Sequence, residues 1–343
     1  MPAVSICLPN LNTARYLPER FESILSQTFT DWECVVSDNF SDDGAWEIIR
    51  NYAAKDPRIK AEQAPRDPQG MYPNWNNCLR RAKGDFIYIA TSDDTMMPDC
   101  LEKLHGALVS HPQCGIAHCQ LLAIDENSRP AAANWRNWDA VRYFGDLIDV
   151  PHIRPAGHDS IVALAMATPY FSITQVMFRR ALLEKAGYFD GRWGSYGDLA
   201  WQMRATLHTS TVHVPETLAT WRVHPAQASQ IDKLAKDRAG GMLVRMAREF
   251  VDYARSVRCS TGQKISRSLL RYTERQMIEE QWRVARSWEK PFILLRAVLG
   301  HPRGALLFLR TYLQVKRTGG FRLDGSLRRD IEKAGISAPL RCS

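Results

Sequence analysis

Short apolar runs alternate with helical patterns through the first 125 residues, and this alternation limits the fold more than any other feature of the chain. Apolar runs typical of buried strands occur at residues 4–8, 32–36, 59–63, 86–90 and 115–124. Apolar residues at helical spacing fill the intervals at 18–27, 44–54, 74–82 and 99–109. Strands that alternate with helices of about ten residues form βαβ units and a mainly parallel sheet. We therefore expect an α/β fold in which helices flank the sheet.

Polar residues follow the predicted strands at the points where the strands end. Asn10 and Asn12 come after the first strand, Asp38 ends the second, and Asp93 with Asp94 follows the fourth. In open α/β sheets, ligands bind beyond the carboxyl ends of the strands. The chain has no G-x-G-x-x-G and no G-x-x-x-x-G-K-[ST] loop, which argues against a dinucleotide enzyme and against a P-loop nucleotidase. We expect the polar strand ends to form a binding site of another kind.

Two adjacent carboxylates, Asp93 and Asp94, end the fourth apolar run. Two like charges side by side repel each other unless a positive group lies near them. They could lie in a solvated loop or cap the helix that begins near Pro98, because acidic residues favour helix starts. They could also hold a hard cation such as Mg²⁺ or Mn²⁺, which prefers oxygen ligands and often shares them with a phosphate. Position alone leaves both interpretations open.

Three further positions could carry chemistry. Asp38 stands at a strand end, where a carboxylate can accept a hydrogen bond from a nucleobase N–H. Ser195 and Asp198 have the spacing of a capping box ahead of a predicted helix, but Asp198 could also lie exposed in a cleft as a general base. His224, in the stretch W-R-V-H-P, is either a structural histidine or a ligand, and a lone histidine is more often the former.

The last third of the chain differs from the rest in pattern and in charge. Residues 233–343 contain 24 Lys and Arg against 10 Asp and Glu, whereas residues 1–232 contain 21 against 27. This asymmetry indicates a polyanionic partner or surface. A helical bundle with a solvated basic face and an interfacial contact with an anionic membrane both account for it. Nucleic acid is not expected, because no recognition motif accompanies the charge. Helices are predicted at 234–257, 264–287 and 292–315, the last broken near Gly300.

Composition and cysteine use suggest where the protein resides. No apolar run approaches the roughly 20 residues needed to span a bilayer. The start of the chain lacks the basic region and cleavage site of a signal peptide. The eight cysteines form no C-x-x-C pair, which suits buried free thiols in a reducing compartment and argues against a zinc site. We expect a cytoplasmic protein, either free or peripheral on the inner face of the plasma membrane.

Several stretches, taken in order, resemble one known family. They are VSICLPNLN at 4–12, VVSDNFSDDG at 35–44, AKGDFIYIATSDD at 82–94, GDLAWQMR at 197–204 and WRVH at 221–224. Their order and rough spacing are similar to those of family 2 glycosyltransferases with the GT-A fold, over about residues 3–230. The resemblance implies a GT-A (Rossmann-like) catalytic domain at 1–230, divided into a nucleotide-binding half at 1–125 and an acceptor half at 126–230. Residues 231–343 would form a basic helical C-terminal region.

The resemblance implies how the nucleotide is bound. Pro9, Asn10 and Asn12 match the first-strand segment that contacts the nucleotide in this family. Asp38 matches the aspartate that recognises the base, which is usually uracil. Ser37 replaces the first residue of a frequent Asp-Asp pair, so the base and ribose contacts would fall to Asp38 and its neighbours.

The resemblance also implies the metal site and the general base. Asp93 and Asp94 match the end of the D-x-D region, which touches the ribose and holds a divalent ion, Mg²⁺ or Mn²⁺, on the diphosphate. His224 falls where some relatives place a further metal or phosphate contact. Asp198 matches the residue that deprotonates the acceptor hydroxyl. Thr91 stands where relatives often have the first Asp of D-x-D, so the ion would rest on Asp93, Asp94 and phosphate oxygens.

The family implies transfer with inversion, and the missing Q-x-x-R-W signature of processive members favours addition of a single sugar. We predict a metal-dependent hexosyltransferase that moves one sugar from a nucleotide-sugar donor, most often a UDP-sugar in this family, to a hydroxyl of a glycan or lipid-linked acceptor in bacterial surface-polysaccharide biosynthesis. A non-catalytic sugar-nucleotide-binding or scaffold subunit with the same fold is one alternative, given Thr91 and Ser37. A nucleotidyltransferase is another, although such enzymes carry a Gly-rich loop after the first strand and residues 10–16 contain no glycine.

Overall fold

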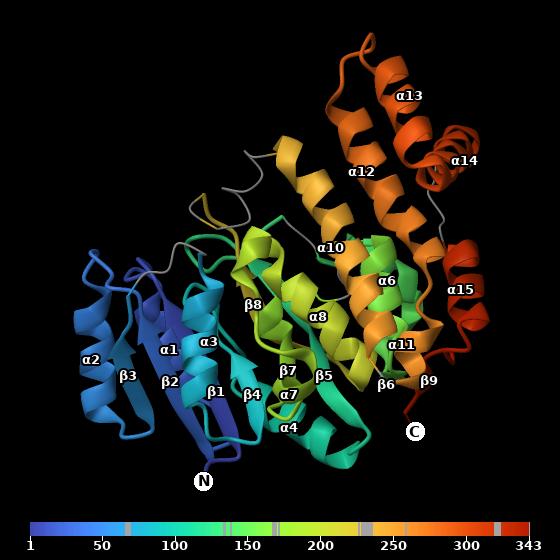
Figure 1. Cartoon of the computed structure of the whole chain (residues 1–343). Helices are drawn as coiled ribbons and strands as arrows, with labels where there is room; N and C mark the ends of the chain where they lie inside the picture. The colour runs from blue at the N-terminus through green and yellow to red at the C-terminus, as the bar shows by residue number, and fades with distance from the viewer. Residues whose placement is uncertain are drawn as a thin grey trace.

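The computed structural model of the 343-residue chain describes residues 1–65, 70–132, 135–137, 139–166, 170, 172–225, 227, 236–257, 259–318 and 324–342. Within these residues, nine strands form one sheet in the order β3-β2-β1-β4-β7-β5-β8-β6-β9. The sheet is mixed but mostly parallel, and helices cover both of its faces (Figure 1). The α/β class predicted from the alternating pattern is confirmed.

The N-terminal half of the sheet is parallel throughout. β1 lies between β2 and β4, and β3 pairs with the outer side of β2. The register places Asn10 beside Asp38 at the ends of β1 and β2. Two of the predicted nucleotide-binding residues are therefore neighbours at the carboxyl edge of the sheet. The strands are β1 (Val4–Asn10), β2 (Trp32–Asp38), β3 (Ile59–Gln63) and β4 (Phe86–Ile89).

Two hydrophobic cores enclose these strands, because side chains alternate between the faces of a strand. On β1, Val4, Ile6 and Leu8 pack in a core with helices α1, α2 and α4, whereas Cys7 packs on the other face with α3. The sheet is thus held between helical layers, and the strand ends remain available for a site. The helices are α1 (Leu17–Leu25), α2 (Ala45–Lys55), α3 (Tyr72–Arg81) and α4 (Cys100–Ser110).

The second half of the sheet is mixed. β7 (Val176–Arg179) lies between β4 and β5 (Cys114–Ile124) and is antiparallel to both. β8 (Ser210–Arg222) runs parallel to β5. β6 (His152–Arg154) and β9 (Leu340–Arg341) complete the edge.

The apolar runs at 211–214 and 218–223 predict two short strands, but the structure has the single strand β8. The polar residues between them, Pro215 to Thr217, interrupt the apolar pattern that indicates a strand. The sheet accommodates them as an irregularity, with shifts of register between Cys119 and Leu121 of β5.

The C-terminal helices pack against the second half of the sheet domain. Buried side chains of α6, α8, α10, α12 and α15 share one core, for example Ile161, Leu199, Phe250, Tyr272 and Leu327. The helices are α5 (Asp139–Phe144), α6 (His158–Met166), α7 (Leu182–Ala186), α8 (Gly197–His208), α10 (Lys236–Ser256), α11 (Ser260–Lys264), α12 (Leu270–Val284), α13 (Lys290–Gly300), α14 (Pro302–Thr318) and α15 (Asp324–Lys333).

The predicted break at Gly300 is confirmed, because α13 ends there and Pro302 begins α14. The expected domain boundary at 230/231 and the expected helix start at 234 fall outside the described residues, so the division into two domains stays a prediction. Among the described residues, no helix is long and apolar enough to cross a membrane.

Candidate active site

Asp93 and His224 face each other at the carboxyl edge of the sheet. Asp93 follows β4 and His224 follows β8, and His224 Nε2 lies 3.0 Å from Asp93 Oδ2. The Asp93 side chain is 22% exposed and that of His224 is 8% exposed. The ring of Tyr16, 5.1 Å from the imidazole between centroids, packs beside the pair. The fold thus brings together two predicted metal ligands that are 131 positions apart.

Asp94 points into the protein and not toward this pair. Its Oδ2 accepts a hydrogen bond of 2.5 Å from the Thr91 hydroxyl, and its Oδ1 accepts one of 2.7 Å from the Arg222 N–H. Burial, together with the negative charge of Asp93, raises the pKa of Asp94 to about 7. The hydrogen bonds from Thr91 and Arg222 oppose this rise, and so does the fully buried guanidinium of Arg20 on α1. Asp94 therefore braces the turn that presents Asp93.

The helix-cap interpretation of these two carboxylates is wrong. Helix α4 begins at Cys100, its N-cap residue is Asp99, and no side chain caps it. The acidic pair lies further upstream, in the turn between β4 and the helix. Asp93 and Asp94 are therefore too far from Asp99 along the chain to cap α4.

Arg222 holds the turn and was not singled out from the sequence, although it lies inside the W-R-V-H stretch. Its side chain is buried, and its Nε donates to the Asp93 carbonyl oxygen at 2.6 Å. One terminal nitrogen donates to Asp125 O at 3.0 Å and the other to Glu19 Oε2 at 2.7 Å. Its guanidinium also lies over the Tyr16 ring at 4.8 Å. Arg222 thereby fixes the backbone that carries both Asp93 and His224.

Asp38 sits at the end of β2 with its carboxylate fully buried. Its Oδ1 accepts from Asn10 Nδ2 at 2.7 Å and from Ser41 Oγ at 2.6 Å. Its Oδ2 accepts from the Ser41 N–H and from Gln63 Nε2, both at 3.1 Å. The carboxylate therefore fixes the loop after β2 against the end of β1. On β1, Pro9 precedes Asn10 and is buried beside Ser37 of β2.

Asn12 extends this loop contact toward solvent. It is exposed and has a positive φ of 53°, a conformation that asparagine tolerates better than most residues. Its N–H donates to Ser41 Oγ at 2.9 Å, and its Oδ1 accepts from the Asp42 N–H at 3.0 Å. The loops after β1 and β2 are therefore joined into one surface.

Asp198 lies in the first turn of α8, partly exposed. Its Oδ1 accepts from the Tyr72 hydroxyl at 3.1 Å and from the Leu199 N–H at 2.8 Å. No hydrogen bond from the described residues reaches its Oδ2. Burial raises the pKa of this carboxyl group, and the hydrogen bonds from Leu199 and Tyr72 oppose the rise. One oxygen is thus held in place while the other remains available.

The predicted capping box from Ser195 to Asp198 is wrong, because the N-cap of α8 is Tyr196 and its side chain makes no capping hydrogen bond. Gly197 is needed here for space: a Cβ on it would lie 2.4 Å from a ring carbon of Tyr72. Nothing in the sequence indicated a role for Tyr72, because its hydroxyl contacts Asp198, which lies 126 positions away in the chain.

Helix α3 joins Asp198 to the carboxyl edge of the sheet. Two residues after Tyr72, Asn74 donates from Nδ2 to the carbonyl oxygens of Asn10 at 3.2 Å and Ser37 at 3.0 Å. The first turn of α3 therefore touches both Asp198 and the ends of β1 and β2. The predicted base and the predicted nucleotide site lie at the same edge.

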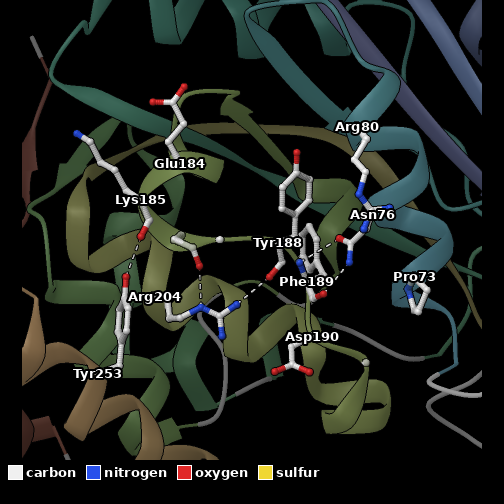
Figure 2. A pocket seen from close by; sticks show the side chains of 13 residues that line it. Pro73, Asn76, Arg80, Glu184, Lys185, Tyr188, Phe189, Asp190, Arg204 and Tyr253 are labelled. Atoms are coloured by element: carbon white, nitrogen blue, oxygen red, sulfur yellow. Dashed lines mark hydrogen bonds between the residues drawn. The ribbon is translucent and has the colours of Figure 1, made fainter.

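A separate cavity of about 690 Å³ lies between α3, α7 and α8. Figure 2 shows Asn76 and Arg204 reaching the segment before α8: Asn76 Nδ2 donates to Phe189 O at 2.7 Å, and Arg204 donates from Nε to Ala186 O at 2.8 Å and from a terminal nitrogen to Tyr188 O at 3.0 Å. None of the predicted site residues lines this cavity. Its polar side chains brace the chain that leads to Asp198.

Asp93 and His224, at the carboxyl edge of the sheet, fit a divalent ion whose coordination shell is completed by oxygen atoms of a bound substrate. Within the described ranges, no group of three or more His, Cys, Asp or Glu side chains could hold a metal alone. Mg²⁺ and its analogues often take one or two carboxylates and complete their shell with substrate phosphates and water. Asp93 and His224 supply an oxygen and a nitrogen side by side. Asp94 is less suited, because both of its oxygens accept hydrogen bonds from the protein.

Comparison with known proteins identifies the family. The model of glycosyl transferase family 2 matches residues 5–187. The chain belongs to this family. Its curated relatives include the putative glycosyltransferase EpsE of Bacillus subtilis, 36% identical over 126 residues, which are 36% of this chain and 45% of EpsE. The GalNAc(5)-diNAcBac-PP-undecaprenol beta-1,3-glucosyltransferase of Campylobacter jejuni is 34% identical over 104 residues, 30% of this chain and 34% of that protein. These matches thus span less than half of the relatives' own length.

Solved structures confirm the fold. S. aureus TarS 1-349, in complex with UDP-GlcNAc, superposes with a TM-score of 0.56 at 17% identity and covers 92% of each chain. The mannosyltransferase PcManGT of Pyrobaculum calidifontis, in complex with GDP-Man and Mn²⁺, has a TM-score of 0.54 at 20% identity and covers 97% of this chain and 86% of its own. At these identities the likeness establishes the fold alone.

Proposed function

We propose that this protein is an inverting glycosyltransferase that moves one sugar from a nucleotide-sugar donor to a hydroxyl of a glycan or lipid-linked acceptor in bacterial surface-polysaccharide biosynthesis. The observation that carries the proposal is the placement of Asp198, with one oxygen available, at the same sheet edge as the Asp93–His224 pair. Family membership supports it, as do relatives and neighbours named as glycosyltransferases or bound to sugar nucleotides.

The donor nucleotide would lie against the joined loops after β1 and β2. Asn12 is the exposed member of this surface, while Asn10, Pro9 and Asp38 support it from below. Direct contact between Asp38 and the base stays a prediction. The carboxylate already accepts four hydrogen bonds from the protein, which favours an indirect role. We propose that Asp38 acts on base recognition by fixing Ser41 and the loop that receives the base. A UDP-sugar is the proposed donor, in line with the TarS complex with UDP-GlcNAc.

Asp93 and His224 would hold a divalent ion on the donor diphosphate. Such an ion, when bound, neutralises the charge that develops on the leaving diphosphate. Asp94 supports this arrangement from behind, because its hydrogen bonds to Thr91 and Arg222 fix the turn. Arg222 keeps Asp93 beside His224 by binding the Asp93 carbonyl oxygen.

Asp198 would act as the general base. Its Oδ2 accepts the proton of the acceptor hydroxyl as that oxygen bonds to the anomeric carbon, while Tyr72 and Leu199 hold Oδ1. The bond between the anomeric carbon and the donor phosphate oxygen breaks in the same step. Attack opposite the leaving group inverts the anomeric centre. The raised pKa of Asp198 makes it a stronger base toward the hydroxyl.

Nucleoside diphosphate release tests the proposal against its alternative. The protein is incubated with Mn²⁺ and a panel of UDP-, GDP- and dTDP-sugars, and both binding and slow hydrolysis of each donor are measured. An enzyme releases the nucleoside diphosphate from its own donor and does so faster when an acceptor is added. A binding or scaffold subunit would bind a donor and release nothing, and that result would overturn the catalytic proposal.

A further inference from the structure

Helices α13 and α14 carry a concentration of exposed apolar side chains. Of the 15 large hydrophobic side chains that are exposed among the described residues, eight lie between Trp288 and Val315. Single exposed hydrophobic residues are ordinary, whereas a contiguous group marks an interaction surface. Figure 1 shows these helices beside the end of α12 that is remote from the sheet, where they project from the molecule. A small core around Ile278 and Phe308 joins them to α12.

Helix α13 presents its apolar side to solvent. Phe292, Leu295 and Leu299 follow the spacing of one helical face and are 67%, 58% and 77% exposed. Ala297, on another side of the helix, is buried against α12 and α14. Together with Trp288, which is 65% exposed, the three residues line an open groove of about 1200 Å³ along the last turns of α12.

Helix α14 presents a stripe in which arginine and leucine alternate. Arg303, Leu306, Arg310, Leu313 and Arg317 are spaced by three and four residues, so they share one face, and all five are exposed. The opposite face is buried in the core that α14 shares with α12. Over residues 290–318, six Lys and Arg occur and no Asp or Glu. Among the described residues, Glu289, beside Trp288, is the one carboxylate that lines the groove, so this surface is apolar and strongly cationic overall.

We propose that α13 and α14 dock on an anionic lipid bilayer. Phe292, Leu295 and Leu299 enter the headgroup region, and the arginines of α14 contact lipid phosphates. Exposed apolar residues beside cations are the features by which helices bind membrane interfaces without spanning them. A second copy of the chain fits less well, because a two-fold interface would bring the same cationic surface against itself. Charge therefore selects the bilayer as the partner.

The surface has a consequence for the reaction. In Figure 1, α13 lies toward the same end of the molecule as the carboxyl ends of β1, β2 and β4. A bilayer bound there would be on the side where Asp93 and Asp198 lie, which suits an acceptor anchored in lipid. Bilayer binding needs no turnover, so it can hold or fail independently of the proposed transferase activity.

Vesicle flotation tests the proposal with the full-length protein. Vesicles of phosphatidylcholine alone are compared with vesicles that also contain phosphatidylglycerol, at low and at physiological salt. We expect binding to the anionic vesicles only, weakened by salt. Replacing Arg303, Arg310 and Arg317 by Gln should weaken this binding by about tenfold or more. Replacing Phe292 and Leu299 by Ser should abolish the binding that persists at physiological salt.

A matched control replaces three exposed basic residues elsewhere, Arg50, Lys55 and Lys333, by Gln. It changes the net charge equally and should leave vesicle binding unchanged. Equal losses in both arginine and control variants would overturn the proposal, since only net charge would then matter. A wild-type protein that ignores anionic vesicles would also overturn it, as would a stable dimer in light scattering that Phe292→Ser dissociates. Thermal unfolding of each variant checks that these surface changes leave the fold intact.

Discussion

The hydroxyl of Thr91 donates a hydrogen bond of 2.5 Å to Oδ2 of Asp94 in the turn after β4. The family resemblance predicts an aspartate at the position of Thr91. The structure shows that the threonine binds a buried carboxylate whose other oxygen accepts from Arg222. The turn therefore directs only one carboxylate, that of Asp93, toward His224.

Replacing Thr91 by Val should destabilise the protein. The change keeps the shape of the side chain but removes a donor to a carboxylate that is largely ionised above its pKa of about 7. A hydrogen bond to a charged group contributes about 2 kcal/mol, so the free energy of unfolding in urea at mildly alkaline pH should fall by about that amount. Thr28→Val is the matched control, because Thr28 also donates to a carboxylate, Glu102, but at the surface. Equal effects of the two variants would contradict the role given to Thr91.

Replacing Tyr72 by Phe should shift the pH dependence of turnover. The Tyr72 hydroxyl lowers the pKa of Asp198 by donating to Oδ1, while burial raises it. Without that hydrogen bond the pKa rises further, and a general base is active only when deprotonated. The acid limb of the kcat–pH profile should therefore move to higher pH, with turnover partly recovered at alkaline pH. A uniform loss of turnover with an unmoved limb would mean that Tyr72 contributes only to packing.

Replacing His224 by Gln should weaken metal binding. The imidazole lies 3.0 Å from Asp93 Oδ2, and the pair is the proposed protein part of the ion site. The Mn²⁺ concentration for half-maximal binding, measured by calorimetry in the presence of UDP, should rise by about 10-fold or more, since even outer-shell partners of metal sites have effects of that size. His111→Gln serves as control, because this histidine is half-buried at the end of α4 and its ring contacts the Ala107 carbonyl oxygen. An unchanged Mn²⁺ affinity in His224→Gln would exclude this residue from the site.

Acid should destabilise the protein through a buried histidine cluster between β5, β6 and β8. His118 and His213 contact each other through Nδ1 at 3.0 Å, and Arg154 donates to His152 at 3.1 Å. Burial and the charge of Arg154 lower the pKa of His118 and His213 well below the usual value, and that of His152 to about 4. Below their unfolded pKa of about 6.5, the unfolded chain binds protons that the native state does not.

Stability should therefore fall as the pH decreases from about 6.5, by about 2 kcal/mol for each such histidine at about pH 5. Asp94 and Asp198 act in the opposite direction, because their raised pKa values favour a bound proton in the native state, for Asp94 up to about pH 7. The three histidines outweigh these two carboxyl groups. Urea unfolding measured at neutral pH and at about pH 5 checks the sign. A free energy of unfolding that is equal or higher at the lower pH would contradict it.

The local elements of the fold were predictable because they depend on periodicity within about ten residues. The alternation of strands and helices, the buried pattern of β1 and the break at Gly300 all follow from neighbouring residues. The insertion of β7 between β4 and β5, and the pairing of β9 with β6, did not follow. Those pairings join segments far apart in the chain, and the periodicity of apolar residues does not indicate which strands pair.

The candidate site residues could be selected from the sequence, but their contacts could not. Asp93, Asp198 and His224 were selected because their residue types and order resemble the family, and their roles stay predictions. That Asp94 points inward, and that Tyr72 holds Asp198, depends on contacts across more than 100 positions. A local motif can also mislead: Ser195 and Asp198 have the spacing of a capping box, but α8 begins without one.

Asp198→Asn provides the most direct test of the account. Asparagine keeps an oxygen that can accept from Tyr72 and Leu199, so the fold and the donor site should remain intact. Turnover with the identified donor and acceptor should fall by ~10²–10⁴-fold, the usual contribution of a general base, while donor affinity measured by calorimetry stays that of the wild type. A variant that keeps wild-type turnover would contradict the assignment of Asp198 as the base and, with it, the proposed active site.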